Sequence, residues 1–572
     1  MAKSVLCTVL AFIMMLAVAG CGGNQPDDGA TVTSAESTAE VASTDSGTKV
    51  SWDDKYETPI TLNVVLSLPQ ASHAEITEPS QTSYFKLAES ELGIKLNILW
   101  SLPPDQYDQK FNLSLLSGDL PDIFSIPYGN VAVYNDLADS GAIWEIGEEY
   151  DDCLHPELLK YYRQPDVKKF KDQIEQVNGA SYSYANVFDS KCNTPYWYIR
   201  KDYLDKLGLG VPGTVEELMD AAKKMSDAGL GTLGIVGGSD GAGFLPDVWG
   251  SMIPVFNCFG AYPGLGNWVV KDGKLESGLI QPEVRDGLLT LQAMYKDGAL
   301  DKNFASKTSA NFTEDVLNGR IGIFSGVWWH AAWPLTTMIK DDSKTDWIAV
   351  PVLPSAKVAA PKTSSVPFVA SHFNMVSKSC KNPEALAKLL SMDYELQVNG
   401  VTRWGKEKAV DTYENNWKPL QLTSSIFDLE HSAANRVAFA KSKEEAMAVI
   451  NEPGNMGSAN LNIALSAIYK YKWEGSKADW GWYFSRAPED SGLGLTEKLY
   501  RDNLVQTNPY VGPPLAADIE KGAALLTARN EAFARVIMGD PISTYDKFVE
   551  SWKKNGGDEM TQQANEWYAK NK

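Results

Sequence analysis

Strand-like and helix-like segments alternate through residues 60–140, and this alternation restricts the possible fold more than any other feature of the chain. The strand-like runs are rich in β-branched residues or alternate apolar with polar side chains, whereas the helix-like runs repeat apolar residues at helical spacing. The strands are expected at 60–68, 94–100 and 122–126, and the helices at 84–92, 105–116 and 131–140. Repeated units of this kind predict an α/β fold.

Helices expected later in the chain carry recognisable start and stop signals. Thr214 and Glu217 form a capping box before apolar residues at helical spacing. Pro282 opens a helix that Gly298 ends. A short strand is expected at 321–324, and helices are expected at 523–538, in a segment capped by Ser543, and at 560–569.

The first residues form an export signal rather than a membrane span. Val5–Leu16 is apolar but shorter than a spanning helix, and small residues follow it. The segment Val18-Ala19-Gly20-Cys21 is similar to the bacterial lipobox, whose cysteine receives a diacylglycerol. We therefore expect residues 1–20 to be a lipoprotein signal peptide and Cys21 to be the lipid anchor. The alternative is an ordinary signal peptide in which the cysteine has no role.

Residues 21–50 are rich in small, polar and acidic residues and contain no aromatic side chain. Such a segment cannot bury enough apolar surface to offset the entropy cost of ordering, so we expect a disordered tether. About 520 residues remain after it, enough for two large domains or several small ones.

Charge and cysteine content exclude some classes of protein. The net charge is −21 and no basic segment is interleaved with aromatics, which argues against a nucleic-acid partner. The four cysteines after Cys21 are too few for a disulfide-built scaffold, and they can form bridges or remain buried thiols. They are Cys153, Cys192, Cys258 and Cys380.

No enzyme motif stands out. The five histidines are scattered without metal-binding spacing, and the chain has no GxSxG, P-loop or strand-to-helix GxGxxG motif. The chain has many acidic residues, so a pair of glycosidase carboxylates is compatible with the sequence, but no motif or spacing identifies one such pair. We therefore expect no catalysis, no metal and no cofactor.

Four segments, in order over nearly the whole mature chain, together match blocks of a known family. They are 117–123 (SGDLPDI), 196–208 with 211–214 (YWYIRKDYLDKLG and VPGT), 318–329 (NGRIGIFSGVWW), and 537–541 with 548–552 (IMGDP and FVESW). With the lipobox, they resemble the sugar-type extracellular solute-binding proteins of ABC importers, in particular the large lipoprotein subgroup common in Gram-positive bacteria.

The resemblance implies a periplasmic-binding-protein-like type II fold, in which two α/β lobes joined by a hinge close over a ligand in the interlobe cleft. It implies that 51–188 and 352–400 form lobe 1, and that 189–351 and 401–572 form lobe 2. It also implies a monomer, lipid-anchored on the extracytoplasmic face of a Gram-positive cell membrane, that delivers an oligosaccharide to permease subunits with their ATPase. The alternatives are a surface glycoside hydrolase and a binding protein for a peptide or other small solute.

One departure from the family's pattern concerns calcium. Many relatives carry an Asp- and Asn-rich calcium loop after the capped helix, whereas Ser226–Leu233 contains a single carboxylate. Because calcium takes several oxygen ligands, we expect no calcium site here.

Aromatic residues are the strongest candidates for ligand contact, since sugar rings pack their C–H faces on aromatic plates surrounded by polar groups. Trp328 and Trp329 follow the strand expected at 321–324 through Gly326, which places them at a strand end, where ligands bind in open α/β sheets. The further candidates are Tyr196, Trp197, Asp247, Trp249, Tyr128, Asn130, His372, Trp404, Trp473 and Tyr510. The alternative for these side chains is a structural role.

Overall fold

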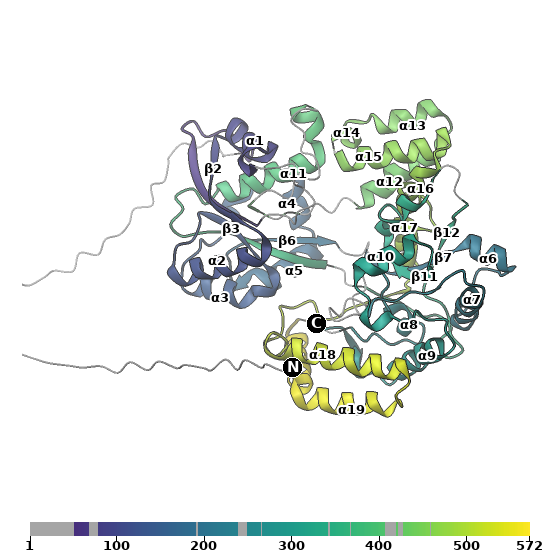
Figure 1. Cartoon of the computed structure of the whole chain (residues 1–572). Coiled ribbons are helices and arrows are strands. Elements are labelled where there is room, and N and C mark those ends of the chain that lie inside the picture. The colour runs from purple at the N-terminus through teal and green to yellow at the C-terminus, as the bar shows by residue number, and fades with distance from the viewer. Residues whose placement is uncertain are drawn as a thin grey trace, which may run out of the picture. The chain divides into compact units, whose positions relative to one another are not determined.

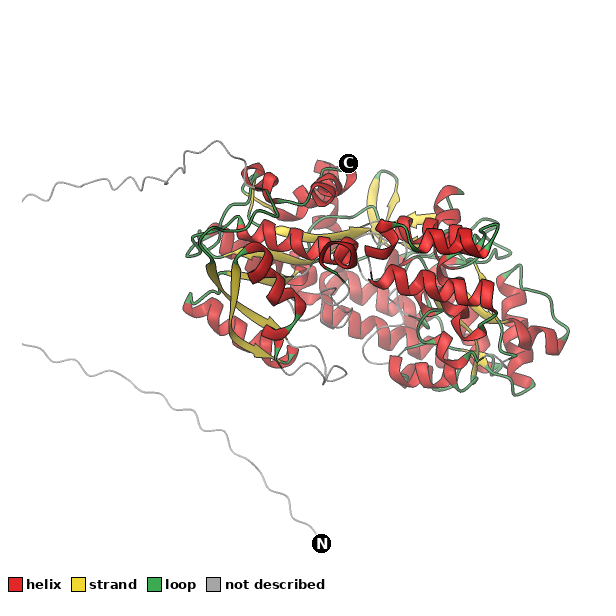
Figure 2. Cartoon of the chain, turned by 90° about the horizontal axis from the view of Figure 1, so that it is seen from above, coloured by secondary structure: helices red, strands yellow, loops and turns green. Residues whose placement is uncertain are grey.

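The computed structural model of the chain describes residues 51–67, 78–189, 193–237, 249–264, 266–340, 344–365, 368–405, 419–420, 422, 427–457 and 459–571. These residues belong to a unit that spans Val50–Lys572. Helices make up most of its regular structure, and the strands form several short sheets (Figure 2). Two large clusters of buried side chains, here called the first core and the second core, organise the fold.

The first core begins with a parallel strand pair. β1 (Ile60–Ser67) pairs with β2 (Ile94–Leu102), and α1 (Ser83–Leu92) lies between them in the chain. α1 ends at Gly93, whose φ of 70° is the left-handed conformation that glycine adopts at little cost. The strand, helix and strand predicted over residues 60–100 are confirmed.

A strand from much later in the chain completes the first core. β14 (Phe368–Val376) lies between β3 (Ile123–Pro127) and β6 (Tyr184–Asp189) and is antiparallel to both. It leads to α11 (Ala385–Trp404), which contacts α1 (Figure 1). The remaining helices of this core are α2 (Pro104–Ser117), α3 (Val131–Asp139), α4 (Pro156–Tyr162) and α5 (Pro165–Glu175).

A four-stranded sheet separates the second core from a smaller cluster rich in aromatic rings. On β7 (Tyr196–Arg200), Trp197 and Ile199 point into the second core, whereas Tyr196 and Tyr198 belong to the aromatic cluster. This is the alternation expected of a strand buried on both faces. The strand order is β12 (Trp347–Val350), β7, β11 (Ile321–Gly326) and β8 (Thr232–Leu233), with β11 antiparallel to β7 and parallel to β8.

Helices surround the second core and form a further group of their own. Those associated with the second core are α6 (Lys201–Leu207), α7 (Val215–Asp227), α8 (Ile253–Asn257), α9 (Val284–Lys296), α18 (Ala516–Met538), α19 (Ser543–Trp552) and α20 (Asp558–Asn571). A separate small core joins α12 (Phe427–Ala438), α13 (Lys443–Ile450), α15 (Ala459–Tyr469) and α16 (Trp480–Arg486). The other α-helices and strands of the described residues are α10 (Ser309–Leu317), α14 (Pro453–Gly457), α17 (Gly492–Arg501), β4 (Gln176–Val177), β5 (Ala180–Ser181), β9 (Trp268–Lys271), β10 (Lys274–Ser277), β13 (Thr363–Ser365) and β15 (Val505–Thr507).

One detail of the predicted organisation is corrected by the structure. Ser543 is the first residue of α19 rather than its cap, because Ile542 already has helical backbone angles. The lobe boundaries at residues 352 and 400 stay predictions, and the residues around them are distributed between the cores as follows. Val352 and Leu353 pack in the second core, β13 pairs with β15, and the first core extends to Leu422.

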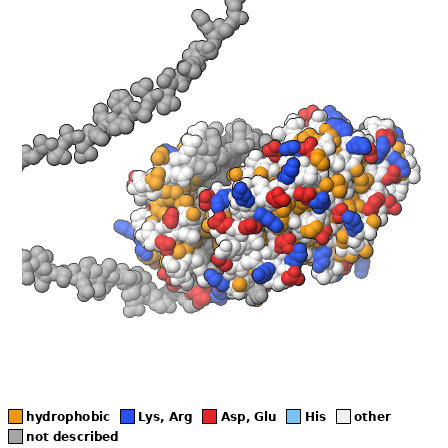
Figure 3. Space-filling model, turned by 90° about the horizontal axis from the view of Figure 1, so that it is seen from below, with side chains coloured by type: hydrophobic (Ala, Val, Ile, Leu, Met, Phe, Trp, Pro, Cys, Tyr) orange, Lys and Arg blue, Asp and Glu red, His pale blue; other side chains and the backbone are white. Residues whose placement is uncertain are grey.

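The cysteines, the surface charges and the length of the helices can be followed over the described residues. Cys153, Cys258 and Cys380 are buried, and burial raises the pKa of Cys258 to about 12. These three favour the buried-thiol alternative, while Cys192 lies outside the described residues. On the face shown in Figure 3, acidic and basic side chains are interspersed. Among the described helices, none has both the length and the apolar character to cross a membrane.

Candidate functional site

β11 leads directly into the segment that holds the principal candidates. Trp328 begins a single 3-10 turn that ends at His330. A Cβ on Gly326 would lie only 2.8 Å from Nδ1 of His330, so the glycine allows this ring to fold back against the strand end. Nδ1 of His330 accepts a 2.9 Å hydrogen bond from Val327 N–H, and burial lowers the pKa of His330 to about 3. The imidazole is therefore neutral and fixes the turn.

Aromatic rings form a stack from the interior to the surface here. The buried Trp249 ring lies parallel to that of His330, with centroids 5.3 Å apart and planes 11° apart. The His330 centroid lies 3.8 Å from that of Trp329, and Trp329 stacks on Trp333 at 6.3 Å with planes 23° apart. Trp329 is half-buried, whereas 59% of Trp333 is exposed. The stack therefore supports an exposed aromatic surface on a buried base.

A second aromatic group surrounds Arg486 on α16. Its guanidinium lies over two indole rings, 4.7 Å from the Trp328 centroid and 4.9 Å from the Trp482 centroid. Trp482 and Arg486 share one helix face, since they are four residues apart. Nε of Arg486 donates to Oε2 of Glu430 over 2.9 Å, and Nη1 donates to Oγ of Ser485 over 2.9 Å. Arg486 is thus a buried cation whose charge Glu430 balances.

α16 approaches the tryptophan segment closely because Gly481 has no side chain. A Cβ at Gly481 would lie 2.7 Å from the carbonyl carbon of Ala331 and 2.8 Å from Cβ of Thr336. Both separations are well below the roughly 3.5–4.0 Å of ordinary carbon contacts. Oγ1 of Thr336 also donates to the Ala478 carbonyl over 2.9 Å. The helix that carries Arg486 and the segment that carries the tryptophans are therefore packed as one piece.

Two predicted residues support this site from within, and a third is buried on the other face of the sheet. Tyr196, Trp197 and Trp249 are each at most 5% exposed, but Trp197 points into the second core. The Tyr196 hydroxyl lies 3.0 Å from that of Tyr198, which donates to the Val327 carbonyl over 2.9 Å. In this structure Tyr196 and Trp249 pack beneath the surface that Trp329 and Trp333 form, and direct contact of any of the three with a ligand stays a prediction.

The first core brings a second group of candidates together. Tyr128 and the exposed Asn130 follow β3, and His372 on β14 lies beside the end of that strand. The Tyr128 hydroxyl donates to the Gly512 carbonyl over 3.2 Å, which brings the segment of Tyr510 close. Burial raises the pKa of Tyr128 and lowers that of His372. Tertiary contacts therefore bring these residues together, while their contact with a ligand stays a prediction.

The remaining candidates lie elsewhere. Trp404 ends α11 and packs on the first core. Nε1 of Trp473 donates to the Val437 carbonyl over 2.9 Å, which gives this ring a structural role in the helical group. Asp247 and Cys21 lie outside the described residues.

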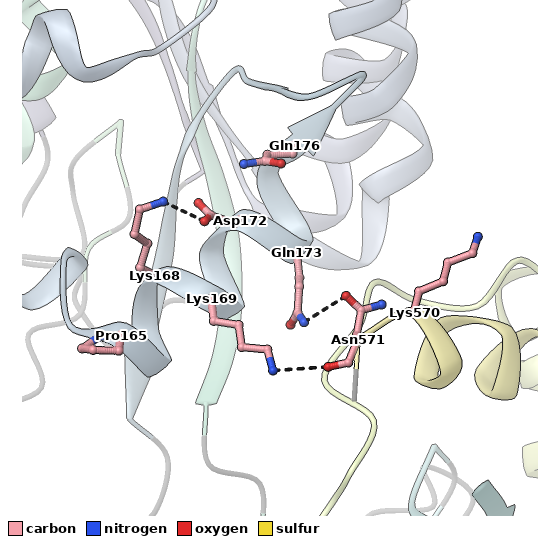
Figure 4. A pocket seen from close by; sticks show the side chains of 8 residues that line it. All are labelled: Pro165, Lys168, Lys169, Asp172, Gln173, Gln176, Lys570 and Asn571. Atoms are coloured by element: carbon pink, nitrogen blue, oxygen red, sulfur yellow. Dashed lines mark hydrogen bonds and ion pairs between the residues drawn. The ribbon is translucent and has the colours of Figure 1, made fainter. Parts of the chain in front are cut away.

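Three cavities lined by described residues lie away from the predicted site. One cavity of about 680 Å³ lies between α5 and the end of α20 (Figure 4). There, Nζ of Lys169 donates to the Asn571 carbonyl over 3.3 Å, and Nε2 of Gln173 donates to Oδ1 of Asn571 over 3.4 Å. Two others, of about 410 and 320 Å³, lie beside β9 and β10 and beside α5. None of these three linings contains a predicted ligand-binding residue.

Sequence reasoning missed four residues of the site: Trp333, Trp482, Arg486 and Glu430. The first could have been found, because Trp333 follows Trp329 by four residues in an aromatic-rich segment. The helical spacing of Trp482 and Arg486 indicates a shared face but not what that face contacts. Glu430 has no local signal.

Comparisons with known proteins agree with this architecture. A family model described as bacterial extracellular solute-binding protein matches residues 72–392, more than half of the chain. The chain is 23% identical over 514 residues to lipoprotein LipO of Bacillus subtilis strain 168, covering 85% of this chain and 89% of LipO. It is 22% identical over 498 residues to the polygalacturonan/rhamnogalacturonan-binding protein YtcQ of the same strain, covering 86% of this chain and 88% of YtcQ.

The fold also matches a solved structure. FusA of Streptococcus pneumoniae, an ABC-transporter substrate-binding protein in complex with kestose, superposes with a TM-score of 0.58. The match has 18% identity and covers 89% of this chain and 99% of that one. The predicted two-lobed α/β fold is confirmed.

Proposed function

Because the chain belongs to the bacterial extracellular solute-binding protein family, we propose that it is the binding subunit of an ABC importer and carries an oligosaccharide. Two relatives support a sugar ligand. YtcQ is a polygalacturonan/rhamnogalacturonan-binding protein, and FusA is a fructooligosaccharide ABC transporter substrate-binding protein. Relatives in this family bind substrates, and the proposal includes that this chain has no catalytic activity of its own.

The stack of Trp329 and Trp333 carries the proposal. Sugar rings pack their C–H faces on indole rings, and an exposed indole held by a buried base loses little entropy on binding. Arg486 lies over the neighbouring Trp328, and both side chains are buried, so this pair supports the plate from below. Together these side chains offer an exposed aromatic plate on an ordered base.

Closure and anchoring complete the proposed mechanism. The first core and the second core form the centres of two lobes, and the contact of Tyr128 with Gly512 links them. Ligand binding favours a closed arrangement, which docks on the permease as a monomer. Cys21 carries the lipid that holds the protein on the extracytoplasmic face of the membrane.

Titration calorimetry against a panel of plant and microbial oligosaccharides tests the proposal. We expect a sugar that binds the wild-type protein to bind Trp329→Ala or Trp333→Ala at least about tenfold more weakly, which corresponds to about 1.4 kcal/mol. Phe439→Ala is the matched control, because Phe439 is 55% exposed and contacts Lys472 and Tyr483 in the separate helical group.

Wild-type affinity in both tryptophan variants would remove this surface as the sugar site. Shortened sugar after long incubation would indicate a glycoside hydrolase instead. Absence of binding across the panel, together with binding of a peptide, would replace the sugar by another solute.

A further inference from the structure

An oligosaccharide ligand can be neutral or can carry carboxylates, and the two classes require different charges in a binding site. A carboxylate that leaves water needs an unbalanced cation or several charge-assisted hydrogen bonds. A hydroxyl needs only an ordinary donor or acceptor. The net charge of the side chains around the site's tryptophans therefore determines whether the site favours neutral or carboxylate-bearing oligosaccharides.

Arg486 lies over the indole rings of Trp328 and Trp482, and no other described cation lies over these two rings or over those of Trp329 and Trp333. Its charge is already balanced, because Nε lies 2.9 Å from Oε2 of Glu430 and both side chains are 8% exposed. Attraction between such a buried pair is stronger than in water. The pair as a whole is neutral.

A further acidic group lies behind the pair. Nδ1 of His431 lies 2.6 Å from the Arg486 carbonyl oxygen, so this nitrogen carries the proton and donates. Nε2 of the same ring lies 3.6 Å from Oε2 of Glu497. A ligand carboxylate placed beside Arg486 would therefore meet Glu430 and the field of Glu497, with no unbalanced positive charge among the described residues that contact the rings.

We propose that this site selects neutral oligosaccharides and discriminates against sugars that contain uronates. This inference rests on the proposed function, namely that the ligand is an oligosaccharide. Arg486 has a structural task in it, since its buried guanidinium packs over Trp328 and Trp482 and, balanced by Glu430, brings no net positive charge to the site. Glu430 prevents the same group from pairing with a ligand carboxylate.

Matched pairs of sugars test the proposal on the wild-type protein. Trigalacturonate is compared with its carboxyl-reduced form, and cellotriose with its C6-oxidised form, by calorimetric titration at low and high salt. In each pair that binds, we expect the neutral member to bind at least about tenfold more tightly. Its affinity should change little with salt, because screening acts on charged ligands.

The opposite outcomes separate two failures. Tighter binding of the uronate member, weakened by salt, would overturn the selectivity while leaving oligosaccharide binding intact. If none of the four sugars binds, nor any in the wider panel, the proposed function fails and this inference fails with it.

Glu430→Gln tests the mechanism of selectivity. The amide keeps the shape of the side chain but leaves the charge of Arg486 unbalanced, so we expect the uronate member to gain about tenfold in affinity relative to its neutral partner. Phe439→Ala should leave the ratio unchanged. An unchanged ratio in a folded Glu430→Gln protein, checked by its thermal unfolding, would refute the role given to Glu430.

Discussion

Replacing Gly481 with alanine tests whether α16 and the tryptophan segment are packed as one piece. The new Cβ would lie 2.7 Å from the carbonyl carbon of Ala331 and 2.8 Å from Cβ of Thr336. Carbon atoms that are not bonded approach to about 3.5–4.0 Å, so the overlap is roughly 1 Å. Because Ala331 contributes backbone, a side-chain rotation cannot relieve the overlap, and the helix must move away by a similar distance.

The expected cost follows from the size of this shift. Overpacking a close contact lowers the free energy of unfolding by about 1–3 kcal/mol, and a backbone neighbour places Gly481→Ala near the upper end. The unfolding temperature should fall by about 1–3 °C, because the unfolding entropy of a unit this long is roughly 1 kcal/mol/K. Sugar affinity should fall as well, since the movement separates Arg486 from Trp328.

Thermal unfolding and calorimetric titration of the variant measure both effects. Gly454→Ala on α14 is the control, because its Cβ would meet nothing within 4 Å. Alanine in a helix should leave this control as stable as the wild type or more stable by up to about 1 kcal/mol. If Gly481→Ala unfolds at the wild-type temperature and binds sugar with wild-type affinity, the close packing of α16 on the tryptophan segment is wrong.

Two further predictions concern protonation and anchoring. Burial lowers the pKa of His330 from 6.5 to about 3, so between these values the unfolded chain binds a proton that the folded chain does not. His330 therefore reduces the free energy of unfolding as the pH falls below about 6.5, by up to about 1.4 kcal/mol per pH unit. His330→Gln should flatten this slope, as measured by urea unfolding between about pH 4.5 and 7. An unchanged slope would contradict the burial of this ring. Cys21→Ser should move the protein from the membrane fraction to the soluble fraction, and a variant that stays with the membrane would rule out the anchor.

Local features of the fold were predictable because neighbouring residues determine them. Gly93 ends α1 through a left-handed conformation that other residues rarely adopt. Oγ1 of Thr214 accepts a 3.2 Å hydrogen bond from Glu217 N–H, as the capping box indicated, although the Glu217 carboxylate accepts from Gly213 N–H. Such features depend on two to five consecutive residues, so the sequence displays them directly.

Long-range pairing was not predictable in the same way. β14 enters the sheet of the first core between β3 and β6, and nothing in its own residues specifies these partners. For the site, the sequence placed Trp328 and Trp329 after a buried strand, and the structure has them there, after β11, while their contact with a ligand stays a prediction. The contact of Arg486 with Trp328 joins residues far apart in the chain, and spacing within one helix cannot reveal it.

The proposed sugar site needs both buried and exposed aromatic rings. A sugar plate must be exposed to meet its ligand, yet an indole on a loose segment would lose conformational entropy on binding. The ring stack resolves this conflict, because Trp249 and His330 hold Trp329 from the buried side while Trp333 presents an open face. The same reasoning applies to Arg486, whose position over two indoles is fixed before a ligand arrives. Under the proposed function, the order required for recognition is therefore built in during folding, so the binding energy of the sugar remains available for closing the lobes.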